Sequence, residues 1–189
     1  MLVHGHGREN ASAKDSKWIT DRQQLTSPEG APTKSGSSSP DPLYEEIILI
    51  NDNGELLEGT QTNFYVVKNA NTIITANKGV LFGSVRDSVL RVCYTHDIHV
   101  ELRPPTLEDL KCASGVFITS TSRWVMDAHE VQLGDLLLIK SGSSDTDEKS
   151  MPASKTEVQS YFYGSCLTTD KIRKRVLEDV ETHSTPIYT

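Results

Sequence analysis

Two stretches decide how this chain folds: residues 58–67, EGTQTNFYVV, and residues 79–87, GVLFGSVRD. The first ends in the apolar run 64–67, which is typical of a buried strand. The second places Gly83 directly before an amphipathic segment and therefore predicts the beginning of a helix. Together the two stretches predict a carboxylate, that of Glu58, on a strand near the N-terminus of a helix.

Residues 84–96, SVRDSVLRVCYTH, predict a helix that can bind an anion at its N-terminus. Its apolar residues recur on one face at helical spacing, namely Val85, Val89, Leu90, Val92 and Cys93. We expect Ser84 to be the N-cap and Asp87 to be the acidic partner of a capping box. The free N–H groups of the first turn and the positive end of the helix dipole favour a phosphate there. The simpler alternative is that Ser84 and Asp87 only cap an ordinary helix.

Glu58 is expected at the end of a strand, where the chain enters a turn of small residues. Residues 46–50, EIILI, predict a buried strand, and the turn 51–54, NDNG, follows it. Further along, residues 68–71, KNAN, predict a hairpin turn before a strand at 72–75. A glutamate is by default a solvated surface charge, so this context alone does not assign a function to Glu58.

The order of these motifs resembles that of the class IV aminotransferases, the fold-type IV pyridoxal-phosphate enzymes. The group includes branched-chain aminotransferases, D-amino-acid aminotransferases and aminodeoxychorismate lyase. The matching residues are, in chain order, Glu58, Gly59, Asn63, Leu81, Gly83, Arg86 and the segment 116–121, VFITST, and the resemblance spans residues 3–131. It implies an α/β fold of the α+β type, namely the C-terminal cofactor-binding domain of that family, with a mixed sheet or pseudo-barrel and flanking helices.

The resemblance also implies roles for individual residues in binding pyridoxal 5'-phosphate. Glu58 corresponds to the glutamate that pairs with the pyridine nitrogen, where a carboxylate keeps the ring protonated. Gly83, Ser84 and Val85 correspond to the helix start whose N–H groups hold the phosphate, and Thr121 to a threonine whose hydroxyl adds a donor. Ser84 and Val85 replace the commoner Ile-Thr pair, so the hydroxyl usual at position 85 is missing. Because the other contacts are largely main-chain, we expect the phosphate site to persist.

The family requires a lysine upstream of the glutamate to hold the cofactor covalently. Lys14 is the best match, because 13–19, AKDSKWI, resembles the family's Lys-x-x-Asn followed by an apolar residue, with Lys17 in place of asparagine. Lys17 is the fallback, whereas Lys34 lies in a Pro/Ser/Gly-rich run and is an unsuitable nucleophile. The alternative for Lys14 is a solvated lysine. A nucleophilic amine must be desolvated or lie beside positive charge, since a free amine stays protonated near neutral pH.

The remaining residues of interest are expected to be structural or to lie at the rim of the pocket. Asn63 and Arg86 are expected to orient the turn and the capping region. Residues 124–126, WVM, are predicted to be core residues, because aromatic and methionine side chains are usually buried; the alternative is that they form the wall of the pocket. Ser122 and Arg123 follow the matched threonine and are candidates for the rim of the substrate pocket.

The sequence predicts one domain, a pyridoxal-phosphate-binding domain over residues 1–189 that lacks the small N-terminal domain of the family. Two segments rich in small and polar residues, 26–42 and 141–156, predict flexible insertions. Further elements are predicted at 97–102 (strand), 106–110 (helix, with Thr106 as N-cap), 115–119 (strand) and 167–183 (helix).

Composition limits the classes of function that the chain can serve. Its 189 residues are 36% apolar, with a formal net charge of −7. The length suffices for one core, no apolar run is long enough to cross a bilayer, and the negative charge argues against nucleic acid as a partner. Cys93, Cys112 and Cys166 show no metal-ligand spacing and cannot all pair, which favours a reducing compartment and predicts a cytoplasmic protein without a metal site.

The reaction implied by the resemblance is transfer of an amino group between an amino acid and a 2-oxo acid. Lys14 would hold the cofactor and carry the proton at the α carbon, while Glu58 keeps the ring electron-poor. The family's homodimers imply a homodimer here. Two alternatives remain: a lyase of the aminodeoxychorismate type that uses the same cofactor, and a non-catalytic interaction protein built on part of the enzyme.

Overall fold

The computed structural model describes residues 1–7, 11, 18, 45–134 and 159–183. The predicted insertions at 26–42 and 141–156 lie outside the described residues, as do Lys14, Lys17 and Lys34. The described elements are, in chain order, β1 (Leu2–His6), β2 (Ile47–Ile50), β3 (Leu56–Gly59), β4 (Asn63–Asn69), β5 (Thr72–Thr75), α2 (Ser84–Thr95), β6 (His99–Leu102), α3 (Leu107–Lys111), β7 (Gly115–Ser120), β8 (Trp124–Ala128), β9 (Glu130–Leu133), β10 (Ser160–Phe162) and α5 (Leu167–His183).

The predicted elements are confirmed, with shifts of one or two residues at most ends. The helix predicted over 84–96 is α2, and the strand predicted at 97–102 is β6. The helix predicted at 167–183 is α5 and has the predicted ends. Thr106 is the N-cap of α3, as its position before an acidic first turn indicated.

The strands of the described part form one mixed sheet. Its order is β10-β9-β1-β2-β3-β4-β5-β6, and β7 pairs with β4 and β8. β1 runs parallel to β2 and β9, and β5 runs parallel to β6. The other strand pairs are antiparallel. This mixed sheet with flanking helices confirms the predicted fold class.

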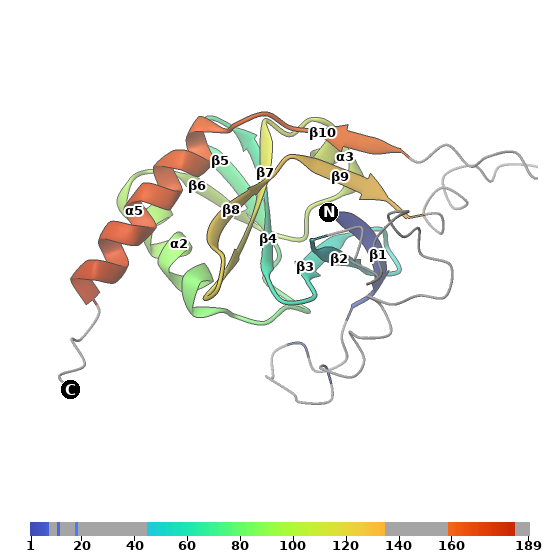
Figure 1. Cartoon of the computed structure of the whole chain (residues 1–189), viewed down its shortest axis with the longest axis horizontal. Coiled ribbons are helices and arrows are strands. Elements are labelled where there is room, and N and C mark those ends of the chain that lie inside the picture. Colours follow the sequence, from blue (N-terminus) through green and yellow to red (C-terminus); the bar gives the residue numbers. More distant parts are fainter. Residues whose placement is uncertain (8–10, 12–17, 19–44, 135–158, 184–189) are drawn as a thin grey trace, which may run out of the picture.

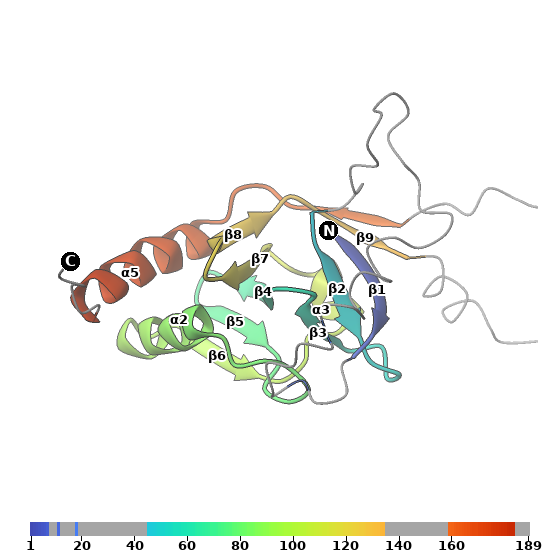
Figure 2. The same cartoon turned by 60° about the horizontal axis from the view of Figure 1, so that its bottom comes forward.

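α2 and α5 lie side by side against one face of the strands β4, β5, β7 and β8 (Figures 1 and 2). The core on this face includes Tyr65 and Phe117, whose rings stack with centroids 4.4 Å apart. Because side chains alternate along a strand, the intervening residues Phe64, Val66 and Ile118 pack into a second core on the opposite face. The face covered by α2 is also the one toward which the candidate site residues point.

Trp124 corrects one expectation, since it was predicted to be buried with Val125 and Met126. Val125 is buried and Met126 is partly buried, but 39% of the Trp124 surface is exposed. Trp124 also has a φ of 53°, a left-handed conformation that is costly for a residue with a side chain. Its position directly after the β7–β8 turn explains both features, because the turn geometry overrides the apolar character of the residue.

The described residues bear on two predictions made from composition. No helix among them is both long enough and apolar enough to cross a membrane. Cys93, Cys112 and Cys166 carry free thiols, and burial raises the pKa of Cys93 to about 12. Cys93 and Cys166 are buried, whereas Cys112 is exposed.

α3 begins with a capping box that an arginine reinforces. The Thr106 hydroxyl accepts the Asp109 N–H at 3.1 Å, and the Asp109 carboxylate accepts the Thr106 N–H at 2.8 Å. The Arg103 guanidinium donates to both Asp109 oxygens, at 2.7 and 2.8 Å. Chiefly through this guanidinium, and also through the Thr106 donors, the pKa of Asp109 lies well below its ordinary value.

Replacement of Asp109 by asparagine should therefore lower the free energy of unfolding by about 1 kcal/mol at pH 7. Because the folded-state pKa is depressed, the stabilisation is present above the unfolded-state pKa of about 4 and is lost as the pH falls below it. Urea unfolding of the wild type and the variant should show a difference that shrinks between pH 4 and pH 2. The exposed neighbour Glu108, replaced by glutamine, is the control; an Asp109 effect that does not change with pH would contradict this assignment.

Candidate active site

Three strands bring the candidate site residues into one row across the sheet. Glu58 on β3 pairs with Asn63 on β4, and Asn63 pairs with Thr119 on β7. Residues paired directly across strands point to the same face. Thr119 points to the face covered by α2, because its hydroxyl lies 3.2 Å from that of Tyr65 in the core beneath the helices. The row therefore places the Glu58 carboxylate on the side of the sheet where α2 begins.

Glu58 is a buried carboxylate bonded to the loop that leads into α2. Only 3% of its surface is exposed, so the alternative of a solvated surface charge is wrong. Its Oε2 accepts the Leu81 N–H at 2.8 Å. The Asn63 side-chain amide donates to the Leu81 carbonyl at 2.6 Å. Glu58 and Asn63 thus bind the N–H and the carbonyl of Leu81, which fixes this residue of the loop. Asn63 therefore has the orienting role expected of it.

The beginning of α2 differs from the predicted cap. Gly83, not Ser84, is the N-cap, with φ −73° and ψ 151°, and it makes no side-chain capping hydrogen bond. Asp87 does not complete a capping box; its carboxylate accepts a hydrogen bond from Arg91 at 2.8 Å instead. The reason is that the helix starts one residue earlier, so Asp87 lies past the third helical position where a capping box requires it. The first-turn N–H groups are therefore left without a side-chain cap, which suits an anion site.

Gly83 fits closely against the cross-strand row. A Cβ at this position would lie 2.7 Å from the Asn63 Oδ1, a distance that atoms in proteins do not tolerate. The Gly83 N–H donates to the Leu81 carbonyl at 3.1 Å, which keeps the loop compact. Glycine is thus required here for close approach of the helix start to β4, and not for an unusual φ.

The contact at Leu81 limits the distance between Glu58 and the first turn of the helix. Ser84 follows Leu81 by three residues, and even a fully extended chain would cover only about 11 Å over that span. Ser84 is exposed, while Val85 is buried against the core and can offer only its backbone to a ligand. The carboxylate and the helix N-terminus are therefore close enough for one small molecule to reach both.

Thr121 lies in the exposed turn between β7 and β8, two residues after Thr119. A span of two residues is at most about 7 Å. The hydroxyl of Thr121 therefore lies beyond the same end of the sheet as the turn 60–62, which follows Glu58. The structure brings Glu58, Gly83 and Ser84 together through the loop, and it places Thr121 at the neighbouring strand end.

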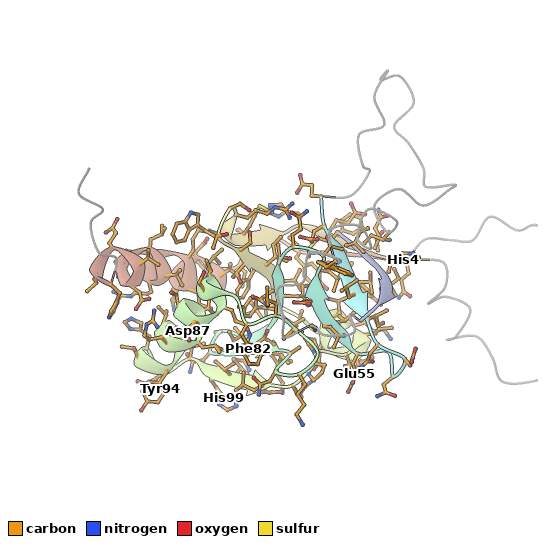
Figure 3. The ribbon with its side chains drawn as sticks, turned by 90° about the horizontal axis from the view of Figure 1, so that it is seen from below. His4, Glu55, Phe82, Asp87, Tyr94 and His99 are labelled. Atoms are coloured by element: carbon orange, nitrogen blue, oxygen red, sulfur yellow. The ribbon has the colours of Figure 1, made fainter. Side chains whose placement is uncertain are left out.

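Arg86 has a structural position beneath the loop. It is 4% exposed, donates to the Ala76 carbonyl at 3.0 Å, and its guanidinium lies 4.6 Å from the centre of the Phe82 ring. Burial lowers its pKa. Figure 3 shows Phe82 and Asp87 at the start of α2. Arg86 thus supports the loop 76–82 from inside, as expected from the sequence.

The structure also identifies site residues that the sequence did not reveal. Glu46, directly before β2, is 3% exposed and bonds to the backbone and the hydroxyl of Thr60 in the turn that follows Glu58. Trp18 donates its indole N–H to the Thr60 carbonyl at 2.8 Å. Nothing in the sequence distinguishes Glu46 from its exposed neighbour Glu45, because only the fold brings Thr60 to it.

A cavity of about 420 Å³ opens on the other face of β7. The residues lining it are Met1, Glu45, Glu46, Ile118, Met126, Asp127, Ala128, His129, Glu130 and Gln132. Glu46 connects it to the turn at Thr60, but none of Glu58, Gly83, Ser84, Val85 or Thr121 lines it. The candidate site is therefore the helix start and the strand ends, and not this cavity.

Part of the chain is similar to a known family. The family model described as Amino-transferase class IV matches residues 42–131. A putative branched-chain-amino-acid aminotransferase of Methanocaldococcus jannaschii is 34% identical over 89 residues, which are 46% of this chain and 31% of that protein. D-alanine aminotransferase of Bacillus licheniformis is 40% identical over 83 residues, which are 43% of this chain and 29% of that protein.

Solved structures of aminotransferases share the fold. The branched-chain aminotransferase of Thermoproteus uzoniensis with norvaline superposes with a TM-score of 0.65 at 16% identity, over 95% of this chain and 50% of that chain. A branched-chain amino acid aminotransferase from T.th. with pyridoxamine 5'-phosphate gives a TM-score of 0.62 at 20% identity, over 97% of this chain and 50% of that one. The chain spans 31% of the Methanocaldococcus protein and half of these solved chains. Residues 42–131, less than half of the chain, are the part that matches the class IV aminotransferase family.

Proposed function

We propose that this chain is the cofactor-binding part of a pyridoxal-phosphate-dependent aminotransferase. The observation that carries the proposal is the hydrogen bond from the Leu81 N–H to the buried Glu58 carboxylate. This contact places a negative charge beside the loop that opens into the uncapped N-terminus of α2. A phosphorylated, protonatable aromatic cofactor matches this arrangement. Its protonated ring nitrogen suits the Glu58 carboxylate, and its anionic phosphate suits the N-terminus of α2.

The described residues fit such a cofactor. Gly83 leaves the helix start open, since a side chain there would collide with Asn63. The Thr62 hydroxyl, in the turn 60–62 that follows Glu58, is buried without a hydrogen-bond partner among the described residues. A buried polar atom without a partner is costly unless a ligand or water satisfies it. These features support a polar ligand at the β3–β4 turn.

Each residue would then have a distinct task. The backbone N–H groups of Ser84 and Val85, with the Thr121 hydroxyl, would bind the phosphate. Glu58 would hold the proton on the ring nitrogen through a charge-assisted hydrogen bond. Pyridoxal phosphate, when bound, supplies the electron sink that lets the α carbon of an amino acid lose a proton. Lys14 would anchor the cofactor and move that proton.

The assignment of Lys14 rests on the resemblance. Lys14 and the fallback Lys17 lie outside the described residues. The described residue that follows them, Trp18, is hydrogen-bonded to Thr60 in the turn after Glu58.

The proposed substrates are an amino acid and a 2-oxo acid, as the resemblance implies. Branched-chain amino acids and D-alanine appear in the names of the relatives. The proposal includes a homodimer, as the resemblance implies, and a cytoplasmic location, which the free thiols of the three cysteines support.

Absorbance spectroscopy of the purified chain tests this function. We expect saturable binding of pyridoxal phosphate with a visible absorption band, loss of the band when an amino-acid donor is added, and its return when a 2-oxo acid is added. Amino-acid turnover that needs no 2-oxo acid would instead indicate the lyase alternative. Absence of any saturable binding would contradict the proposed function and favour a non-catalytic relative.

Replacement of Ser84 by proline should weaken phosphate binding selectively. Proline is compatible with the first helical position and with the extended Gly83 before it, but it removes one N–H donor. We expect the affinity for pyridoxal phosphate to fall roughly tenfold, as for one hydrogen bond to a charged group. Affinity for pyridoxal, which has no phosphate, should not change. The matched variant Ser84→Ala, which keeps the N–H, should bind like the wild type; equal losses in both variants would contradict a main-chain phosphate site.

A further inference from the structure

The buried Glu46 carboxylate accepts four hydrogen bonds. Its Oε1 accepts the Thr60 N–H at 3.0 Å, the Thr60 hydroxyl at 2.6 Å and the Ile47 N–H at 3.2 Å. Its Oε2 accepts from the Arg123 guanidinium at 3.0 Å. Gly59 lies so close that a Cβ there would be 2.9 Å from the Glu46 carboxyl carbon. Glu46 is thus packed into the turn that follows Glu58 and contacts the β7–β8 turn as well.

Arg123 links Glu46 to the β7–β8 turn. Its guanidinium donates to Glu46 and, at 3.2 Å, to the Glu45 carbonyl. Its own N–H donates to the Ser120 hydroxyl at 3.1 Å, which closes the turn around Thr121. Arg123 is therefore bonded both to its own turn and to the segment that precedes β2.

The conformation of the β7–β8 turn indicates that it is held in place. Trp124 ends the turn with a φ of 53°, which is unfavourable for a residue with a side chain. Such strain persists only where surrounding contacts fix the backbone. The described contacts that can do so include those of Arg123, the contact between the Ser120 and Ser122 hydroxyls, and the pairing of Ser120 with Trp124.

We propose that Glu46 and Arg123 form a positioning pair that fixes the turn carrying Thr121 relative to the turn that follows Glu58. Neither residue contacts the cofactor; the pair sets the spacing between the two ends of the site. The ion pair spans 77 residues of sequence; the Glu46 side chain is 1% exposed and the Arg123 side chain is 28% exposed. Because its carboxylate is shielded from solvent and hydrogen-bonded, the pair restricts geometry more than a fully exposed pair does. The inference rests on the proposed function, because it assigns the Thr121 hydroxyl to the phosphate.

The pair predicts an effect confined to the phosphate end of the ligand. Loss of the Arg123 guanidinium frees the turn of Thr121 from Glu46 and Glu45, but it leaves the N–H bond to Ser120 and the Glu58–Leu81 contact intact. Pyridoxal phosphate should therefore bind roughly tenfold more weakly to Arg123→Met, while pyridoxal binding changes little. A purely structural role would lower stability without changing the ratio of the two affinities.

The experiment compares Arg123→Met, Arg123→Lys and Glu46→Gln with the control Arg175→Met, which removes an exposed pair with Glu178 on α5. We expect the ratio of pyridoxal to pyridoxal-phosphate dissociation constants to fall roughly tenfold in Arg123→Met, less in Arg123→Lys, and not in Arg175→Met. Thermal unfolding is measured in parallel, so that any loss of folded protein is corrected for. An unchanged ratio in all folded variants would overturn the positioning role.

A second readout needs no cofactor and separates this inference from the proposed function. In ¹H–¹⁵N spectra of the free protein, Arg123→Met should shift the backbone resonances of Thr60 and Thr121 together. Shifts confined to residues 122–124 would show that the two turns are not coupled and would overturn the inference. Failure of the wild type to bind pyridoxal phosphate, with coupled shifts present, would instead count against the proposed function alone.

Discussion

Replacement of Lys14 by alanine is expected to abolish covalent retention of pyridoxal phosphate and all amino-group transfer. The physical reason is that no other group can replace an amine that both bonds to the cofactor's carbonyl carbon and moves the substrate proton. After treatment with borohydride, the wild type should carry one cofactor in its intact mass, attached to the peptide that contains Lys14. The alanine variant should carry none.

Two other lysines provide matched controls for this result. Lys17→Ala and Lys34→Ala each remove one other lysine amine from the same part of the sequence. Both variants should retain the trapped cofactor. Non-covalent binding measured with pyridoxamine phosphate, which has no carbonyl, should be similar in all three variants because Glu58 and the helix start are intact. If the trapped cofactor disappears in Lys17→Ala and persists in Lys14→Ala, the nucleophile is Lys17 and the assignment of Lys14 is wrong.

Replacement of Glu58 by glutamine is expected to leave the fold intact but to impair the chemistry strongly. Glutamine keeps the size of the side chain and an oxygen that can accept the Leu81 N–H, so the loop should stay in place. What is lost is the negative charge that holds the ring nitrogen protonated. We expect affinity for pyridoxal phosphate to fall roughly tenfold and amino transfer to fall by on the order of 100-fold.

The Glu58 variant is tested by cofactor titration and by the rate of the amino-acid half-reaction. Glu108→Gln, which removes an exposed carboxylate on α3, is the control for the loss of one charge. Because Glu58 interacts with the ring and not with the phosphate, Glu58→Gln should weaken pyridoxal and pyridoxal phosphate by the same factor. Wild-type rates and affinities in Glu58→Gln would mean that this carboxylate has no part in binding the ring.

The elements around the site could be predicted from sequence because their signals are local. The apolar face of α2 and the runs of β-branched residues in β2 and β4 depend only on residues close in the chain. Thr106 followed by Asp109 likewise specifies its own cap, and the structure has it. The motif order also located Glu58, Gly83 and Thr121 at strand and helix ends.

The details that sequence did not predict depend on contacts between distant segments. Ser84 resembles a cap by composition, but Gly83 occupies that position because α2 packs against Asn63, 20 residues earlier. Trp124 is apolar yet partly exposed, because the β7–β8 turn sets its backbone. Glu46 is buried only because β3 returns to lie beside β2 and brings Thr60 to it. Local propensity contains no information on such pairings.

A titration followed by ¹H–¹⁵N spectra tests most directly whether one molecule bridges Glu58 and the helix N-terminus. The Leu81 N–H reports on the Glu58 carboxylate, to which it is bonded, and the Ser84 and Val85 N–H groups report on the phosphate end. With pyridoxal phosphate, all three resonances should shift together and yield one dissociation constant. With inorganic phosphate, Ser84 and Val85 should shift while Leu81 stays in place. If pyridoxal phosphate leaves Leu81 unchanged and acts only as inorganic phosphate does, the ring does not reach Glu58 and the proposed cofactor site is wrong.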